Sequence, residues 1–338
     1  MNIFKSFTIN GAIRQASRSS VFRIYQGKGL RTARQYSTRD GVKKSGLSNG
    51  VLLGLLGTGI LGSIAYNSQS GKTHPSQGLN PGSVFNSKGF VSLELREVQP
   101  VNHNTSLFRF ALPEGHISGL PTASCVIAKH TSGKFFPIIR PYTPVSNEKA
   151  VGHIDFIIKK YEDGSMTSII HNMKPGDTLD FKGPMLKYDW EKNQKQNVGM
   201  IAGGTGITPM LQLIRRIFDE ESPYKSTKVS LIYANQTEQD ILLKSELDEI
   251  AQKHPDRFKV VYALDKAPEN WTGITGFVDK QALQAHLPGP QDEDSVIFVC
   301  GPTPMVKSIA GETFLMSQGK FSGILKELGY SNKNVFKF

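Results

Sequence analysis

The strongest constraint on the fold is an apolar run at 198–202, VGMIA, that leads directly into the glycine-rich sequence GGTGITP at 203–209. So short and continuous a run is typical of a strand buried in a parallel sheet. Apolar residues at 211, 213, 214, 217 and 218 then follow with helical spacing. Thr208 suits the N-cap of this helix and Pro209 its first turn. A glycine turn between a strand and a helix lets backbone N–H groups approach a pyrophosphate.

The rest of the second half repeats this alternation. Strands are predicted at 229–234, 259–264 and 296–300, with helices near 241–253, 279–286 and 303–311. The sequence CGPTPM at 300–305 begins where the last of these strands ends. We therefore predict an α/β doubly wound domain over 193–338, with its ligand beyond the carboxyl ends of the parallel strands.

Residues 90–192 show a different pattern. Short alternating runs at 91–95, 107–112, 124–128, 154–159 and 178–182 are separated by Pro and Gly, and the one helical candidate lies near 165–173. Strands at this spacing predict a small antiparallel β-barrel.

The sequence RPYTPVS at 140–146 is the most distinctive part of this first domain. Its two prolines hold the chain extended, so that alternate side chains face the same way. Arg140 offers a planar fork for a pyrophosphate and Tyr142 a hydrogen-bonding ring edge, with Thr143 as a further candidate. A proline-rich surface loop is the alternative.

The formal charge of +11 is concentrated at the N-terminus. Residues 1–44 hold ten Lys/Arg and one acidic residue, whereas the other 294 residues hold 30 basic and 28 acidic ones. A nucleic-acid binder needs its basic excess on the folded surface, so we expect no nucleic-acid partner. The Arg- and Ser-rich composition is typical of a mitochondrial targeting arm, and a disordered basic tail is the alternative.

No charged side chain occurs from 45 to 71, and the apolar core of this segment, 50–66, has seventeen residues. As a helix these would extend over roughly 26 Å, close to the ~30 Å of a hydrocarbon layer. We predict one transmembrane helix within 45–71 and a spacer at 72–89; a buried core helix is the alternative.

Cys125 and Cys300 are the only cysteines, too few for a disulfide framework or a zinc site, and we expect no metal.

The pattern Arg-x-Tyr-Thr-x-x-Ser at 140–146 resembles the flavin signature of the ferredoxin–NADP reductase superfamily. The form with Pro after Arg is similar to the NADH-cytochrome b5 reductases, especially the mitochondrial fungal type. The likeness covers 90–338, with departures at GPMLKY (183–188), which lacks a second glycine, and at Thr303, where the family usually has Pro. It implies FAD contacts from Arg140, Tyr142, Thr143, Ser146, Ile158, Tyr161, Gly164, Met166 and Thr167.

The same resemblance implies that the second domain binds the nicotinamide nucleotide. The residues that it implicates are Gly203, Gly204, Thr205, Gly206, Thr208, Pro209, Asp240, Cys300, Gly301, Pro302 and Met305. Thr205, Cys300 and Lys159 are the candidate catalytic residues. A small polarisable thiol at a strand end can orient a ring without attacking it, so we interpret Cys300 as positional; a buried structural cysteine is the alternative.

The choice of nucleotide is predicted from ANQTEQD at 234–240, which contains two acids and neither Arg nor Lys. A 2′-phosphate would meet Glu238 and Asp240 without a cationic partner, whereas a free ribose hydroxyl can donate to a carboxylate. In the family the matching aspartate disfavours NADPH. We therefore expect NADH.

The resemblance implies that NADH reduces FAD and that the electrons pass singly to the haem of cytochrome b5. An NADH flavin reductase with another acceptor, such as a quinone or a ferric chelate, is one alternative, and a non-catalytic flavin-binding membrane module is another. We expect a membrane-anchored monomer in the mitochondrial outer membrane, with release into the intermembrane space as the other outcome. The sequence itself carries no signal for the oligomeric state.

Overall fold

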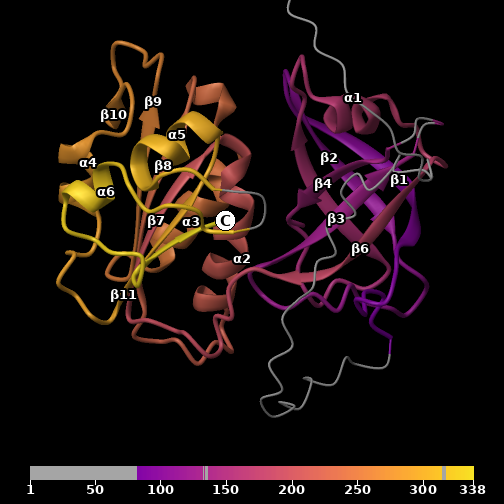
Figure 1. The fold of residues 1–338 in the computed structure, drawn as a ribbon, viewed down its shortest axis with the longest axis horizontal. Coiled ribbons are helices and arrows are strands. Elements are labelled where there is room, and N and C mark those ends of the chain that lie inside the picture. Colours follow the sequence, from indigo (N-terminus) through magenta and orange to yellow (C-terminus); the bar gives the residue numbers. More distant parts are fainter. Residues whose placement is uncertain (1–81, 132, 134–135, 314–316) are drawn as a thin grey trace, which may run out of the picture. The chain divides into compact units, whose positions relative to one another are not determined.

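The computed structural model describes residues 82–131, 133, 136–313 and 317–338, all within one compact unit (Figure 1). The predicted targeting arm, the predicted transmembrane segment and most of the spacer lie outside these residues. Within the described ranges no helix has the length and apolar character needed to cross a membrane.

The first domain is a six-stranded antiparallel sheet in the order β4-β3-β6-β1-β2-β5. Its strands are β1 (Val91–Asn102), β2 (Thr105–Ala111), β3 (Ser124–His130), β4 (Ile138–Tyr142), β5 (His153–Lys159) and β6 (Thr178–Leu186), with helix α1 (Ser165–Asn172) between β5 and β6. The predicted strands and the predicted helix are confirmed. A β4–β5 ladder, which would close the predicted barrel, is absent among the described residues.

Aromatic side chains fill the core of this domain. The Phe156 and Phe181 rings stack at 5.3 Å between centroids, and Phe110 meets Phe181 edge-on at 4.9 Å. Tyr142 of β4 reaches Phe156 of β5 at 6.3 Å. The two end strands therefore approach through side chains while their backbone edges stay unpaired with each other, which leaves room for a ligand between them.

The second domain is a six-stranded parallel sheet in the order β10-β9-β8-β7-β11-β12. Its strands are β7 (Asn197–Gly203), β8 (Lys228–Asn235), β9 (Phe258–Leu264), β10 (Ile274–Thr275), β11 (Ser295–Cys300) and β12 (Val335–Lys337). Its helices are α2 (Ile207–Phe218), α3 (Lys244–Lys253), α4 (Lys280–His286), α5 (Thr303–Ala310) and α6 (Ile324–Glu327), with 3-10 turns η1 (Gly204–Gly206) and η2 (Glu238–Asp240).

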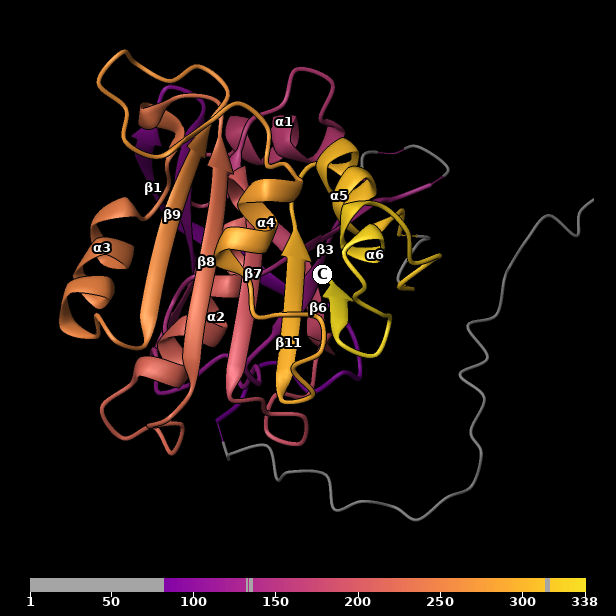
Figure 2. The ribbon, with the colours of Figure 1, turned by 90° about the vertical axis from the view of Figure 1, so that its left-hand side faces the viewer.

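Helices cover both faces of this sheet (Figure 2). Met200 of β7 packs in the same apolar cluster as Leu211 of α2 and Leu247 of α3, whereas its neighbour Ile201 packs with Leu283 of α4 and Val306 of α5. Alternate residues of a strand point to opposite faces, so both faces must be apolar, as the run at 198–202 indicated. The doubly wound prediction is confirmed.

One local prediction was wrong. Helix α2 begins at Ile207 with Gly206 as its N-cap, so Thr208 is the second residue of the helix. The glycines form the 3-10 turn η1, which continues directly into α2 and moves the helix start upstream. The Thr208 hydroxyl donates to the Thr205 carbonyl oxygen at 3.1 Å. Pro209 does lie in the first turn, as predicted.

Candidate active site

Two cavities meet at the carboxyl ends of β7 and β11, and both domains line them. The first, of about 400 Å³, opens beside strands β4 and β5, and we call it the edge-strand cavity. The second, of about 540 Å³, lies against helix α5, and we call it the α5 cavity. The residues that line both are Lys159, Tyr161, Gly203 and Pro302.

Most of the predicted site residues line the edge-strand cavity. In addition to the four shared residues, these are Tyr142, Thr143, Ile158, Thr167, Thr205, Gly206, Thr208, Pro209, Cys300 and Gly301. Gly204 and Met305 line the α5 cavity. The structure thus brings together two sequence motifs almost 100 residues apart, GGTGITP and CGPTPM.

Glycines make this junction possible. A Cβ on Gly301 would lie 3.0 Å from the Gly203 nitrogen, and one on Gly203 would lie 2.7 Å from the Met305 sulfur. Gly204 has φ = +52° and open space around its missing Cβ. Backbone groups of the turn are therefore exposed to the cavity, as a closely approaching phosphate group requires.

The turn before α1 also depends on a glycine. The Thr167 hydroxyl donates to the Gly164 carbonyl oxygen at 3.1 Å and accepts from the Tyr161 N–H at 3.4 Å. A Cβ on Gly164 would collide with the Thr167 hydroxyl oxygen. No side chain caps the N-terminus of α1, so its first N–H groups remain available to an anion.

Burial keeps the hydroxyl and thiol groups of Tyr142, Cys125 and Cys300 in the edge-strand cavity neutral. It raises the pKa of the Tyr142 hydroxyl to about 12 and that of the Cys300 thiol to about 12. Cys125 also lines this cavity, and burial raises its pKa in the same way. A protonated Cys300 is a poor nucleophile, which agrees with its interpretation as a positional residue.

Four predicted flavin residues line neither cavity: Gly164 of the turn before α1, and Arg140, Met166 and Ser146. The Arg140 guanidinium is exposed and donates one hydrogen bond to the Ile139 carbonyl oxygen at 2.7 Å. The Met166 side chain is 1% exposed and packs in the apolar core. Ser146 accepts from the Asp155 N–H at 3.2 Å.

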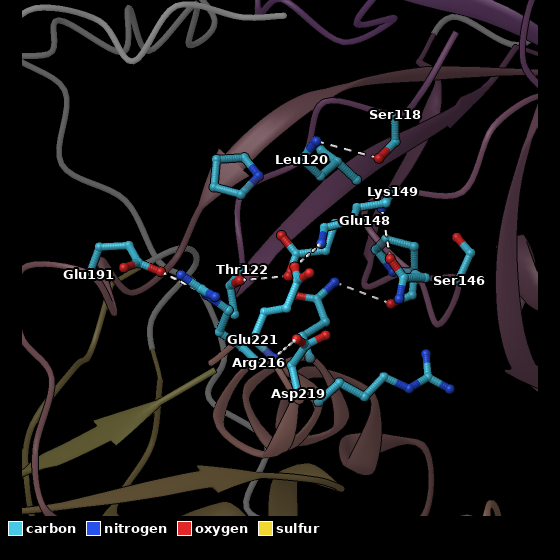
Figure 3. Close-up of a pocket in the computed structure, with 15 residues that line it drawn as sticks. Ser118, Leu120, Thr122, Ser146, Glu148, Lys149, Glu191, Arg216, Asp219 and Glu221 are labelled. Atoms are coloured by element: carbon cyan, nitrogen blue, oxygen red, sulfur yellow. Dashed lines mark hydrogen bonds and ion pairs between the residues drawn. The ribbon is translucent and has the colours of Figure 1, made fainter. Parts of the chain in front are cut away.

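Ser146 lines a third cavity, of about 550 Å³, instead of the edge-strand cavity (Figure 3). Thr122 donates to Glu148 there at 2.9 Å, and Arg216 pairs with Glu191 at 2.9 Å. Its lining contains none of the other predicted site residues. We therefore do not include this third cavity in the candidate active site.

Asp240 does not line the cavity in which a ribose was predicted to meet it. Its side chain is 4% exposed, and the Thr237 hydroxyl and Lys159 ammonium both bind it. Burial alone would raise its pKa, but the Thr237 hydrogen bond and the Lys159 charge hold the pKa below its usual value. Gln236 and Asp265 line the α5 cavity in its place.

Sequence reasoning missed several residues of the cavities, among them Asn235, Phe277 and Phe338. Asn235 ends β8 at the α5 cavity; it is 7% exposed, and neither side-chain polar atom has a partner among the described residues. Phe277 lines the same cavity with 85% of its surface exposed, and the C-terminal Phe338 lines the edge-strand cavity. A polar residue at the end of a parallel strand was the available signal for Asn235.

These features fit the two implied cofactors. Buried amide atoms without partners suit a ligand that carries both donors and acceptors, because an unmade buried hydrogen bond is costly. An exposed aromatic ring beside a cavity suits a flat ring such as adenine. Uncapped N–H groups at α1 and a glycine turn before α2 supply two separate sites for diphosphates.

Comparison with known proteins agrees with an FAD-binding first domain and an NAD-binding second domain. The oxidoreductase FAD-binding domain family matches residues 92–190, and the oxidoreductase NAD-binding domain family matches residues 200–311. NADH-cytochrome b5 reductase 2 of Neurospora crassa is 42% identical over 347 residues, covering 96% of this chain and 98% of that protein. Its namesake in Pyricularia oryzae is 49% identical over 254 residues, covering 74% and 76%.

Solved structures show the same fold. The cytochrome b5 reductase domain of Ulva prolifera nitrate reductase superposes with a TM-score of 0.65 at 30% identity, over 76% of this chain and all of that one. The CS-b5R domains of human Ncb5or give 0.60 at 26% identity, over 74% and 69%. With its flavin-type antiparallel sheet, its nucleotide-type parallel sheet and these relatives, the chain belongs to the NADH-cytochrome b5 reductase family.

Proposed function

We propose that this chain catalyses the reduction of cytochrome b5 by NADH, with FAD as its resident cofactor. The observation that carries the proposal is the meeting of the two cavities at Lys159, Tyr161, Gly203 and Pro302. One cavity has the FAD-domain strands as a wall, and the other has the nucleotide-domain helix α5. Bound FAD would supply the link between a two-electron donor and a one-electron haem, because a flavin can take up an electron pair and release the electrons singly.

The protein's own part is to position the two rings. The edge-strand cavity is lined by Tyr142 at the end of β4, by Thr143 directly after it and by Ile158 on β5. From the second domain, Thr205 in the turn η1 and Cys300 at the end of β11 line the same cavity. Holding two reactants at reaction distance contributes several kcal/mol, on the order of 7–11 in well-oriented systems. No acid–base pair is required, and Cys300 remains a protonated thiol that orients the nicotinamide.

The α5 cavity accommodates the adenine nucleotide part of NADH. Asn235 and Gln236 line this cavity, and the exposed Phe277 ring offers a face for adenine. Lys159 is the one Lys or Arg among its described lining residues, and Asp240 already pairs with it. The additional 2′-phosphate of NADPH would therefore meet no unpaired cation among these lining residues, which supports the choice of NADH.

The acceptor is tested by comparing three of them at one enzyme concentration. We expect purified yellow protein to reduce cytochrome b5 with NADH much faster than it reduces a ferric chelate or a quinone. Rapid bleaching by NADH with no haem reduction would favour the alternative acceptors. A flavin that NADH does not bleach would favour the non-catalytic binding module.

We also propose that the enzyme is a monomer anchored in the mitochondrial outer membrane. The basic arm at 1–44 and the uncharged segment at 45–71 support this placement. Protease added to intact mitochondria should digest a carbonate-resistant reductase. Survival of all activity until the outer membrane is opened would instead indicate the intermembrane space.

A further inference from the structure

We propose that Asp240 is a positioning residue for Lys159 and affects nucleotide binding only through it. This inference rests on the proposed function, because Lys159 is taken to serve the bound dinucleotide. Lys159 lines both cavities, whereas Asp240 lines neither. A carboxylate that does not reach the ligand can still determine where the ammonium beside it lies.

The position of Asp240 is fixed by its own turn. Its Oδ2 atom accepts from the Thr237 hydroxyl at 2.7 Å and from the Thr237 N–H at 3.2 Å, which closes a capping box around η2. The side chain is 4% exposed. Oδ2 is thus bound by the Thr237 hydroxyl and the Thr237 N–H, and Oδ1 remains for another partner.

That remaining oxygen faces the first domain. The Lys159 ammonium donates to Asp240 Oδ1 at 3.3 Å, and the Lys159 side chain is 18% exposed. A lysine side chain has four rotatable bonds and loses rotamer entropy when it is fixed. Because Asp240 already restrains the ammonium, an arriving dinucleotide need not order it.

A second contact keeps the carboxylate at this distance. The Asn102 side chain donates to the Gln239 carbonyl oxygen at 3.2 Å, next to Asp240 in the same turn. His103 Nε2 lies 3.9 Å from Asp240 Oδ1, but the His103 side chain is 60% exposed. The same Nε2 atom is hydrogen-bonded to the Asn104 side-chain amide at 2.9 Å. Lys159 is therefore the close and sheltered partner of Asp240, and His103 a distant one.

The geometry separates two explanations of any effect of Asp240 on nucleotide binding. A direct contact with a ribose would act whether or not Lys159 is present. A positioning role requires Lys159 and disappears when its ammonium is removed. A double-mutant cycle measures this difference.

The experiment titrates NAD⁺ into the FAD-loaded, full-length protein by calorimetry, so that no turnover is needed. We expect Asp240→Asn to raise the dissociation constant about tenfold, as does loss of one charge-assisted hydrogen bond. In a Lys159→Met background the same substitution should change it by less than about twofold. Asp248→Asn, a carboxylate-to-amide change in the same domain outside both cavities, is the matched control and should leave the constant unchanged.

An equal loss in both backgrounds would overturn the proposal in favour of direct contact, and no loss in either would remove Asp240 from nucleotide binding. If Asp240→Asn does not retain FAD, Asp240→Glu, which keeps the charge but displaces it, takes its place with the same two deciding outcomes. Failure of the wild-type protein to bind NAD⁺ would refute the proposed function itself and is distinguished by the wild-type titration.

Discussion

Gly206 lies directly against the Cys300 peptide: a Cβ at position 206 would collide with the Cys300 carbonyl oxygen and lie 2.6 Å from its carbonyl carbon. The nearest atoms belong to backbone and cannot rotate away. The two nucleotide motifs therefore meet only because residue 206 has no side chain.

Gly206→Ala should accordingly separate the two motifs. We expect a loss of about 1–3 kcal/mol in the free energy of unfolding, the usual effect of overpacking, and a fall of more than about tenfold in kcat/KM for NADH. Gly289→Ala is the matched control, because nothing lies within 4 Å of its Cβ position. Equal stability and activity in the two variants would show that the close approach is not needed.

Arg140→Ala should weaken FAD binding. The exposed guanidinium donates one hydrogen bond to the Ile139 carbonyl oxygen, and its other N–H groups can donate to a diphosphate. Loss of one or two charge-assisted contacts should raise the FAD dissociation constant by about ten- to a hundredfold and lower the Tm of the FAD-loaded protein. The exposed Arg96 of β1 provides the control, Arg96→Ala. Full flavin occupancy with an unchanged Tm in Arg140→Ala would show that Arg140 does not bind the FAD diphosphate.

Asn235→Leu should separate stability from binding. Removing a buried amide without partners is neutral or stabilising for the fold, because its desolvation penalty disappears. The same change removes a polar residue from the lining of the α5 cavity, so we expect KM for NADH to rise by about tenfold while the Tm stays equal or rises. An unchanged KM would place Asn235 outside the nucleotide site.

The pH profile tests the state of Cys300. Burial disfavours its thiolate and raises the pKa to about 12, so the thiol stays protonated from about pH 6 to about pH 9. Over that range kcat/KM for NADH of the wild-type protein and of Cys300→Ala should have the same shape, with the variant lower throughout. A basic limb present in the wild type and absent in the variant would mean that Cys300 ionises in function.

The fold was predictable because hydrophobic periodicity reports local burial. The run at 198–202 is apolar at every position since β7 is covered on both faces, and this could be deduced before any tertiary contact was known. The missing ladder between β4 and β5 could not be deduced in this way, because strand pairing is a long-range property that periodicity does not encode.

The site was predictable where backbone chemistry decides it and less so where side-chain direction does. Gly203 and Gly301 line the cavity because only glycine fits there. Asp240 was predicted from the charges of 234–240 and Ser146 from the family resemblance. In the structure Asp240 binds Thr237 and Lys159, and Ser146 binds the Asp155 N–H. Phe277 carries no sequence signal, since an isolated aromatic residue in a loop resembles many others.

The central claim is tested most directly by an anaerobic titration that counts electrons. The FAD-loaded protein is mixed with excess oxidised cytochrome b5, and NADH is added in small portions while flavin and haem absorbances are recorded. Since hydride carries two electrons and haem accepts one, two molecules of cytochrome b5 should be reduced for each NADH, with the flavin returning to its oxidised spectrum after each addition. Flavin that bleaches and stays bleached beside oxidised haem would contradict the proposed electron transfer.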